Sequence, residues 1–398
     1  TCLGCNLFCP SQNFPYQLIL ENWNVAYKRD GAPPIYRFVI PTLHGNIWDM
    51  LYSLMPKSDR NLVSKWMTTK PRDTILIVGN YTHLFPDLIG ESPIFKDLVL
   101  VDLLDHWEEG AYLYQGGYLD VVQEIGKKCA EDFHKWEVKK IVTFLDAVHY
   151  LIKTVHPNEM GNYYNAEVVT LNQWLLEQIH SKRLNFNTGI GLKVTVHDNC
   201  YSKANGEVYW NDARRLIEMS GCKVVEMRHN RQNALCCGFG EGASWSKNFR
   251  LPFEILGTTK KKFEEAMETG ADALVTYCTG CLYLLWAAKE LFEFPISLIH
   301  SIELVRMAAG EDLTMLEKAH IERAWDIISI ISVHLFTSIF RKNFKITQIA
   351  TEEPIRKKSH FLFLRSFRWM LSFNWIRRIF RAIFKKFVNK YQKRKQFH

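Results

Sequence analysis

The sequence predicts an α/β fold in which two parallel α/β domains follow one another as a pseudo-repeat, with a short cysteine-rich segment before them and a basic helical tail after them. Three observations support this prediction. Short apolar runs alternate with helical segments, which is typical of a parallel sheet covered by helices. The same order of segments occurs twice. Residues 356–398 hold 14 Lys and Arg and no Asp or Glu.

The first repeat is expected over residues 71–190. Residues 16–70 precede it as a helical linker, which Pro33-Pro34 and Pro41 divide into pieces. The repeat contains three apolar runs of strand length and a longer helical segment between the second and the third. The predicted strands are 74–78, 98–101 and 139–143, and the predicted helix is 117–137.

The second repeat is expected over residues 191–312, with the same succession of elements. Its predicted strands are 192–196, 223–226 and 273–276, and its predicted helices are 207–220 and 253–269.

The two repeats correspond residue by residue, but only the second carries cysteines at the ends of its strands. Ile141–Leu145 matches Leu274–Cys278, and Asn80 stands roughly where Cys200 stands. Three further correspondences follow: Glu108-Glu109-Gly110 with Cys236-Cys237-Gly238, Leu145 with Cys278, and Val148 with Cys281. The first repeat is therefore expected to be a scaffold that has lost every thiolate.

The composition describes a globular chain of two or three domains. The 398 residues are 47% hydrophobic and 13% aromatic, enough for real cores. Ten cysteines could form disulfides in a secreted protein. Because eight of them fall into metal-ligand spacings, a reducing compartment is favoured, and Cys129 and Cys222 are expected to be buried packing residues.

Five cysteines of the second repeat form one spaced set, Cys-x35-Cys-Cys-x40-Cys-x2-Cys. Thiolates are the ligands of iron–sulfur clusters. Two adjacent cysteines suit a single tetrahedral zinc poorly, because neighbouring side chains diverge, whereas they can reach different atoms of a multi-iron cluster. The set consists of Cys200, Cys236, Cys237, Cys278 and Cys281.

A second cysteine group opens the chain. Cys2, Cys5 and Cys9, followed by Pro10, reproduce the last three cysteines and the proline of the bacterial ferredoxin pattern C-x2-C-x2-C-x3-C-P. The first cysteine of the pattern would lie just before residue 1. We therefore expect residues 1–15 to be the end of a ferredoxin-like 4Fe-4S domain, with Cys2 and Cys5 on one cubane and Cys9 on another whose other ligands lie upstream.

The motif and the double repeat together resemble the cysteine-rich (CCG) domain of heterodisulfide reductases, over residues 1 to about 312. Similar domains occur in iron–sulfur subunits of anaerobic glycerol-3-phosphate dehydrogenase, lactate utilisation and membrane-bound sulfur-metabolism complexes. The resemblance implies that the five cysteines hold a [4Fe–4S] cluster of the noncubane type, which cleaves a disulfide by binding the thiol halves to iron. Gly238 and Gly280, with Gly240 and Gly242, would let the backbone approach the cluster closely.

Other polar residues near the motif give weaker signals. His197 and Asp198 could relay protons to a reduced thiolate, or could support the site indirectly or lie at the surface. Tyr201 and Tyr277 flank ligands and are expected to be packing residues. Asp146 and His149 belong to the first repeat and are expected to be structural.

Residues 313–398 are expected to form a helical, basic, amphipathic tail. Aromatic and basic residues alternate in it, and a basic amphipathic helix is typical of a membrane-surface anchor. A solvated tail, a helix docked on a partner protein and, from charge alone, nucleic-acid binding are alternatives. The segment 327–340 is too short to span a bilayer. One helical face would hold Trp369, Phe373, Ile376, Phe380, Ile383 and Phe387.

Three functions are compatible with these features. The first is an oxidoreductase subunit in which electrons pass between 4Fe-4S cubanes and the five-cysteine site, where a disulfide is reduced or thiols are oxidised. The second is an electron-transfer subunit that links a dehydrogenase of glycerol-3-phosphate or lactate type to membrane quinone. The third is a metal-stabilised interaction protein without catalysis. The five-cysteine set favours the first, because electron relay alone needs only cubanes.

The expected partners follow from the first function. They are a quinone-reactive or cytochrome b-type membrane subunit, other redox subunits, a thiol or disulfide substrate or small redox protein, and an anionic membrane surface, with no nucleic acid. The expected location is cytoplasmic, at the inner face of the cell membrane.

Overall fold

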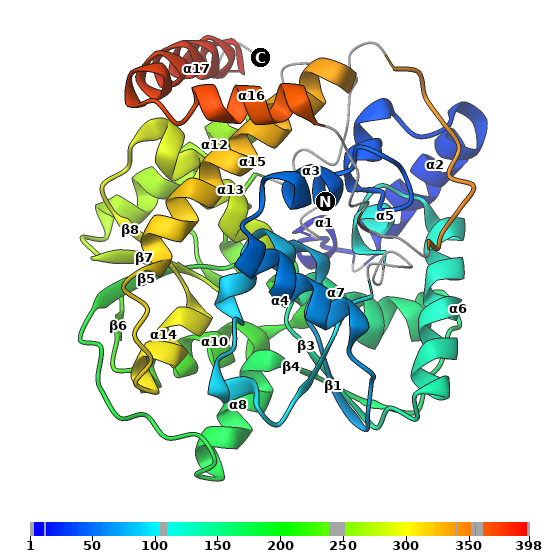
Figure 1. The fold of residues 1–398 in the computed structure, drawn as a ribbon. Helices are drawn as coiled ribbons and strands as arrows, with labels where there is room; N and C mark the ends of the chain where they lie inside the picture. The colour runs from blue at the N-terminus through cyan, green and yellow to red at the C-terminus, as the bar shows by residue number, and fades with distance from the viewer. Residues whose placement is uncertain are drawn as a thin grey trace.

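The computed structural model describes residues 4–11, 13–103, 110–238, 251–338, 341–351, 355 and 361–395. Two four-stranded parallel sheets lie side by side in it (Figure 1). The first has the strand order β2-β1-β3-β4 and the second the order β6-β5-β7-β8, so the predicted tandem α/β fold is confirmed. The strands are β1 Thr74–Ile77, β2 Val99–Val101, β3 Lys140–Thr143, β4 Glu167–Thr170, β5 Lys193–His197, β6 Lys223–Val224, β7 Ala273–Thr276 and β8 Ser297–His300.

Helices connect the parallel strands, as crossover connections between such strands require. The predicted helices at 117–137, 207–220 and 253–269 are present as α6, α10 and α12. The sequence analysis missed the last strand of each sheet, β4 and β8, and the helices that follow them. The helices of the two repeats are α5 Ala111–Gln115, α6 Leu119–Lys135, α7 Asp146–Tyr150, η6 Leu151–Glu159, α8 Leu171–His180, α9 Ser202–Asn205, α10 Glu207–Met219, α12 Leu251–Glu268, α13 Thr279–Phe292 and α14 Ser301–Ala308.

The segment before the first sheet is helical, as predicted, and its prolines lie at element boundaries. Pro34 begins the 3-10 helix η1, where its missing N–H costs no internal hydrogen bond. The side chain of Asn46 caps the next helix by accepting from the N–H of Asp49 at 2.8 Å. The elements are α1 Gly4–Leu7, α2 Pro15–Asp30, η1 Pro34–Val39, α3 Ile47–Leu54 and α4 Lys57–Thr68.

The register of the two sheets agrees with the predicted correspondence between the repeats. Ile77 of β1 pairs with Thr143 of β3, and His197 of β5 pairs with Thr276 of β7. Asn80 and Cys200 each lie three residues beyond these equivalent strand ends.

The equivalence extends to the loops. Gly110 and Gly238 both have positive φ, 81° and 109°, while Glu108 and Glu109 lie outside the described residues. The repeats also face each other in an equivalent way, since α7 packs on α9 and α13 packs on η2 (Asn80–Leu84).

The last three helices pack on the body of the molecule and do not extend away from it (Figure 1). α15 (Leu316–Ser338) crosses α13 and α3 and buries Trp325, Ile327 and Ile330 completely. α16 (Leu362–Met370) lies on α15, and α17 (Asn374–Lys395) lies on α12 and α13.

The single amphipathic face predicted for the tail is wrong. The helix is interrupted between Met370 and Asn374, which rotates the second part relative to the first. Phe380 turns toward the body, with its ring 6.4 Å from that of Trp325, whereas Trp369 and Ile383 remain 65% and 54% exposed.

Basic residues of the tail pair with acidic residues of the body. Arg368 donates to Asp326 at 2.6 Å and Arg381 donates to Glu290 at 3.0 Å. Arg377 and Arg381 lie over the ring of Trp325, 4.7 and 5.1 Å from its centroid. Part of the basic charge of α16 and α17 is therefore compensated within the chain, by Asp326 of α15 and Glu290 of α13.

Candidate metal centre

The five cysteines of the second repeat come together at the carboxyl ends of its strands, where open α/β sheets place ligands. Cys200 follows β5 by three residues. Cys278 follows β7 and precedes α13, and Cys281 lies in the first turn of that helix. Cys236 and Cys237 lie in the loop between β6 and α12. Cys281 and Cys237 are buried, and the other three are half-buried.

Hydrogen-bond contacts join the five thiols in two groups. Cys200 contacts Cys236, and Cys281 contacts both Cys237 and Cys278. No disulfide joins any two cysteines of the set, all five of which are described. The structure therefore brings all five predicted residues together.

The thiols differ in how easily they ionise. The contact with Cys236, together with burial, raises the pKa of Cys200 well above its usual range. Contacts with Cys237 and Cys278 raise the pKa of Cys281 in the same way. The hydrogen bond from Cys281, with the backbone N–H groups of Gly280 and Cys281, lowers the pKa of Cys278. Cys278 precedes the first turn of α13, where helix N–H groups favour a thiolate.

The two predicted glycines have different roles. Gly238 has a φ of +109°, and a Cβ there would lie 2.5 Å from the carbonyl oxygen of Ile255, so only glycine fits. A Cβ on Gly280 would lie 3.6 Å from both Cys278 Sγ and the ring of Tyr81, an ordinary contact distance. Gly240 and Gly242 lie outside the described residues.

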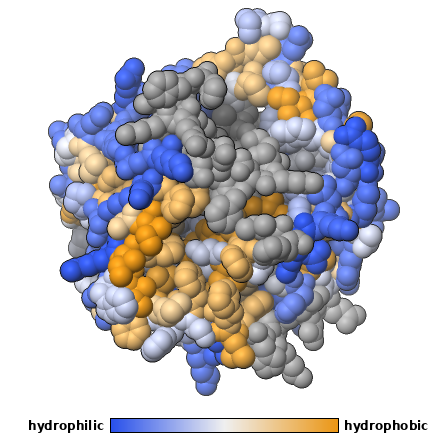
Figure 2. Space-filling model, turned by 90° about the horizontal axis from the view of Figure 1, so that it is seen from above, coloured by the Kyte–Doolittle hydropathy of each residue, from blue (hydrophilic) through white to orange (hydrophobic). Residues whose placement is uncertain are grey.

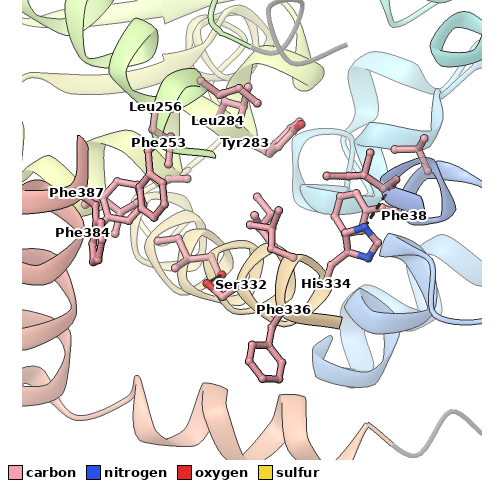
Figure 3. A pocket seen from close by; sticks show the side chains of 18 of the residues that line it. Phe38, Phe253, Leu256, Tyr283, Leu284, Ser332, His334, Phe336, Phe384 and Phe387 are labelled. Atoms are coloured by element: carbon pink, nitrogen blue, oxygen red, sulfur yellow. Dashed lines mark hydrogen bonds between the residues drawn. The ribbon is translucent and has the colours of Figure 1, made fainter. Parts of the chain in front are cut away.

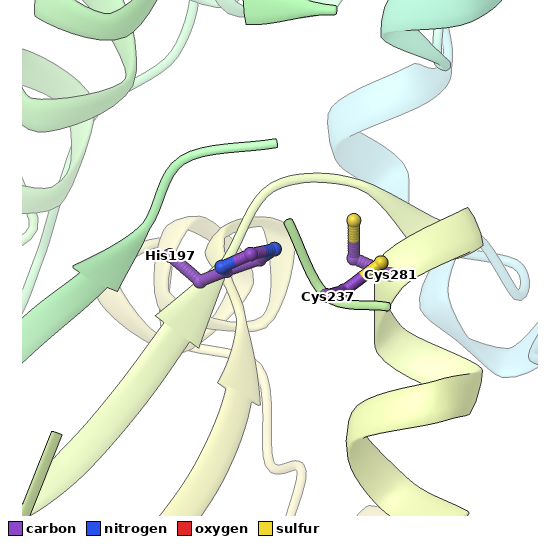
Figure 4. Close-up of side chains that lie close together, drawn as sticks. All are labelled: His197, Cys237 and Cys281. Carbon is purple, nitrogen blue, oxygen red and sulfur yellow. The ribbon is translucent and has the colours of Figure 1, made fainter. Parts of the chain in front are cut away.

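His197, which the sequence offered as a proton relay or a supporting residue, lies beside two of the thiols. One ring nitrogen of His197 and the Sγ atoms of Cys237 and Cys281 lie within 4.8 Å of one another (Figure 4). The imidazole is completely buried, and neither nitrogen has a hydrogen-bond partner among the described residues. Burial lowers the pKa of His197 to about 3, so the ring is neutral. A surface position for His197 is therefore wrong.

Asp198 is also buried, and its role is structural. Both carboxylate oxygens accept from Arg214 at 2.8 Å, and Tyr277 donates to Oδ1 at 2.8 Å. The N–H of Arg231, which belongs to the segment leading to Cys236, donates to Oδ2 at 2.6 Å. Although burial raises it, these bonds and the charge of Arg214 hold the pKa of Asp198 below its usual range. Asp198 therefore ties this cysteine segment to the sheet, and Tyr277 takes part in that network.

The first repeat contributes residues to this site although it lacks thiolates. Asp146 is buried, its carboxylate oxygens have no partner among the described residues, and burial together with the charge of Cys278 raises its pKa well above the usual range. Gln115 donates to the hydroxyl of Tyr201 at 2.7 Å. Tyr81 stacks on Tyr283, with ring centroids 5.1 Å apart.

The N-terminal cysteines lie on the same side of the molecule as the five-cysteine group. Cys2 lies outside the described residues. Cys5 is exposed in α1, and Cys9 is half-buried with its Sγ 3.3 Å from Ser11. α1 packs on α9. Burial, followed by charge on Cys200 and on Cys5, raises the pKa of Tyr16 well above its usual range, so Tyr16 lies within electrostatic reach of both cysteine groups.

The donor set fits a multi-iron cluster. Five thiols gathered at one sheet edge offer more sulfur than one tetrahedral metal ion binds, and soft thiolates are the ligands that such clusters require. The unpaired imidazole of His197 beside two of the thiols adds a nitrogen donor.

Comparison with known proteins agrees with this chemistry. Residues 194–285 match the cysteine-rich domain family (CCG). The chain is 30% identical to the "Probable iron-sulfur-binding oxidoreductase FadF" of Bacillus subtilis, over 49% of this chain and 27% of the relative. It is 25% identical to a subunit of the dihydromethanophenazine:CoB–CoM heterodisulfide reductase of Methanosarcina barkeri, over 52% of this chain and 50% of the relative. It is 24% identical to the EtfAB:quinone oxidoreductase of Syntrophomonas wolfei, over 39% of this chain and 22% of the relative.

The chain thus spans half or less of the length of these relatives. Among solved structures, Picrophilus torridus aspartate racemase aligns with 63% of this chain and 99% of its own, at 13% identity and a TM-score of 0.29, and so low a score supports no conclusion. The predicted resemblance is confirmed: residues 194–285 of the second repeat match the cysteine-rich (CCG) domain family, in a chain similar to iron–sulfur oxidoreductases of the heterodisulfide reductase type.

Proposed function

We propose that the protein is an iron–sulfur electron-transfer oxidoreductase subunit that reduces a disulfide or oxidises a pair of thiols at the five-cysteine site. The observation that supports this most strongly is the convergence of five cysteines, none of them in a disulfide, at the carboxyl ends of the second sheet. Cys200, Cys236, Cys237, Cys278 and Cys281 would hold one [4Fe–4S] cluster, of the noncubane type implied by the resemblance. Such a cluster supplies single electrons and iron atoms to which substrate sulfur can bind.

The remaining residues of the site position these ligands and hold protons. Asp198 and Arg214 fix the segment that carries the adjacent cysteines. Reduction of a disulfide to two thiols takes up two electrons and two protons. Asp146 is a buried carboxyl group whose pKa burial and the charge of Cys278 raise well above the usual range, and we propose that it supplies one of these protons.

The N-terminal group would carry electrons to this site. We propose that Cys2, Cys5 and Cys9 serve ferredoxin-type cubanes, because their spacing follows the ferredoxin pattern. The position of Tyr16 near both Cys5 and Cys200 supports a short path between the two cysteine groups. Other redox subunits are the expected partners, with a quinone-linked dehydrogenase complex as the alternative assembly.

We further propose that the outer face of α17 lies on the cytoplasmic face of an anionic membrane. Trp375, Ile379 and Ile383 are 63%, 51% and 54% exposed there, and they alternate with exposed Arg378 and Lys386. Figure 2 looks down on this end of the molecule and shows hydrophobic groups beside hydrophilic ones. No helix of the described residues is long and apolar enough to cross a membrane.

The cluster assignment is tested by replacing the adjacent cysteines. The Cys236→Ala/Cys237→Ala double variant should lose the iron and the EPR signal of the second repeat, because two of five ligands are gone. The matched control is Cys129→Ala/Cys222→Ala, since both cysteines are buried outside the set, and it should keep full iron content. Full iron in the first double variant would rule the assignment out.

A further inference from the structure

An apolar cavity, separate from the cysteine group, lies among α12, α13, α15, α17 and η1 (Figure 3). Its volume is about 420 Å³, within the range of roughly 300–1,000 Å³ for small-molecule sites. The residues around it are almost all aliphatic or aromatic. They include Phe38 of η1, Phe253 and Leu256 of α12, Leu284 of α13 and Phe384 of α17. Such a lining selects an apolar ligand, because polar groups would lose hydration without replacement.

The rim of the cavity belongs to the exposed apolar end of the molecule. Phe336, Ile383 and Phe387 line the cavity and are also 58%, 54% and 41% exposed. Exposed Lys386 adjoins Phe387 on α17. An exposed apolar opening suits a ligand that enters from a lipid surface, and the basic charge of α17 favours an anionic one.

The inner end of the cavity is lined by aromatic residues and contains one buried polar atom without a hydrogen-bond partner among the described residues. Tyr283 and Tyr112 both line it, and both contact the ring of Tyr81, with centroids 5.1 and 4.8 Å away. Gln115 also lines it and is 4% exposed. Its amide nitrogen donates to Tyr201, but its oxygen Oε1 accepts no hydrogen bond from any described residue. A buried acceptor of this kind calls for a donor.

We propose that this cavity binds an isoprenoid quinol. Its hydroxyl group donates to Gln115 Oε1, its ring packs against Tyr283, and its prenyl chain leaves past Phe387. The inner end also adjoins the cysteine group, because Tyr201 directly follows Cys200 in the chain. The choice of a redox-active lipid rests on the proposed function, but binding itself needs no cluster.

The test measures binding of ubiquinol-2 to the full chain under anaerobic conditions, with ubiquinone-2 and dihexanoyl-phosphatidylglycerol as separate arms. We expect saturable binding of the quinol and weaker binding of the quinone, which lacks the hydroxyl donor. Ser332→Phe should weaken quinol binding at least tenfold, because Ser332 lines the cavity and the new ring fills it. Ser181→Phe is the matched control, since Ser181 is exposed and lies outside the lining. Gln115→Leu should remove the preference for quinol over quinone.

The binding results can be interpreted separately from the cluster assignment. Iron content is measured on the same Ser332→Phe sample and should equal that of the wild type, so a lost cluster and a lost lipid site are distinguishable. Unsaturable quinol binding, or quinol binding unaffected by Ser332→Phe, would overturn the proposal. Equal binding of phosphatidylglycerol at the same site would overturn it too, since the cavity would then accept any hydrocarbon chain.

Discussion

At the scale of single residues, Gly238 has the strictest requirement in the candidate site. We expect Gly238→Ala to lower the free energy of unfolding by at least about 2 kcal/mol, since the left-handed conformation costs an L-residue roughly 1–2 kcal/mol and the new Cβ meets the backbone oxygen of Ile255 at 2.5 Å. Thermal unfolding measures the effect. Gly206→Ala separates the two causes, because Gly206 has a φ of +88° with nothing within 4 Å of a new Cβ. Equal loss in both variants would mean that the clash is relieved by a shift of α12.

His197 gives the second prediction at this scale. If one of its ring nitrogens binds or contacts the cluster, pulsed EPR of protein labelled with 15N-histidine should show a nitrogen coupling that His197→Ala removes. We also expect His197→Ala to lower iron content several-fold, because a buried donor beside Cys237 and Cys281 is lost. His149→Ala is the control, since His149 is buried in the first repeat and contacts Thr143. A spectrum without nitrogen coupling that is unchanged in His197→Ala would assign His197 to packing alone.

The cysteines of the site could be predicted from sequence, but several of their neighbours could not. Spacing identifies a thiolate set because the chemistry needs that residue type. His197 carries only a weak signal in the sequence and Asp146 is expected there to be structural, because the sequence does not show that both are buried without partners among the described residues. That property depends on how the two repeats face each other, which no local pattern encodes.

At the scale of elements, the inner and outer faces of α17 are expected to respond differently to substitution. Phe380 packs toward Trp325, whereas neighbouring Ile379 is 51% exposed. We expect Phe380→Ser to lower the thermal midpoint by several degrees and to expose the surface that α17 covers. Ile379→Ser should leave the midpoint unchanged and weaken sedimentation with anionic vesicles several-fold, more so in high salt.

Val208→Ser provides the control for that measurement, because Val208 is 60% exposed on α10. It should change neither the midpoint nor vesicle binding. Vesicle binding that is unaffected by Ile379→Ser would place the membrane contact elsewhere. An unchanged midpoint in Phe380→Ser would contradict the packed position of α17.

The elements that the sequence analysis missed share a physical cause. β4 and β8 have four residues each and lie at sheet edges, where Glu167 and Ser297 are exposed. They also lack the longer apolar run that identified β1 and β2, although β2 is itself an edge strand. The interruption between α16 and α17 contains neither Gly nor Pro, so the helical spacing of the apolar residues predicted one continuous helix across it.

At the scale of the whole molecule, buried contacts of α15 join the two repeats and the C-terminal helices to one another. α15 buries Trp325 between the body and the tail, and its His320 reaches the first repeat. His320 Nε2 forms an ion pair with Asp87 Oδ2 at 2.9 Å, and its Nδ1 lies 3.8 Å from Glu303 of α14. One buried histidine therefore joins the first repeat, the second repeat and the tail helix.

This arrangement predicts how stability depends on pH. Burial alone would lower the pKa of His320, but Asp87 and Glu303, opposed by Arg323, raise it above the ordinary value of 6.5. A base whose pKa is raised by folding stabilises the native state fully below the unfolded pKa, and this stabilisation is lost as pH rises through the folded pKa. Burial lowers the pKa of His149, His197, His300 and His334 to about 3, so these residues weaken stability only as pH falls below about 6.5.

The last prediction isolates the His320 contribution from these others. The thermal midpoint of the wild type should fall as pH rises from about 6.5 to 9, and that of His320→Gln should fall less over the same interval, because Gln has no proton to lose. Each unit by which folding raises the pKa corresponds to about 1.4 kcal/mol. Below pH 6 the two proteins should lose stability in parallel, since the four buried neutral histidines are present in both. Parallel curves above pH 6.5 would show that His320 is neutral in the folded protein, and that α15 is held by packing of His320 against Phe85 of the first repeat and Trp286 of α13 without help from the charge.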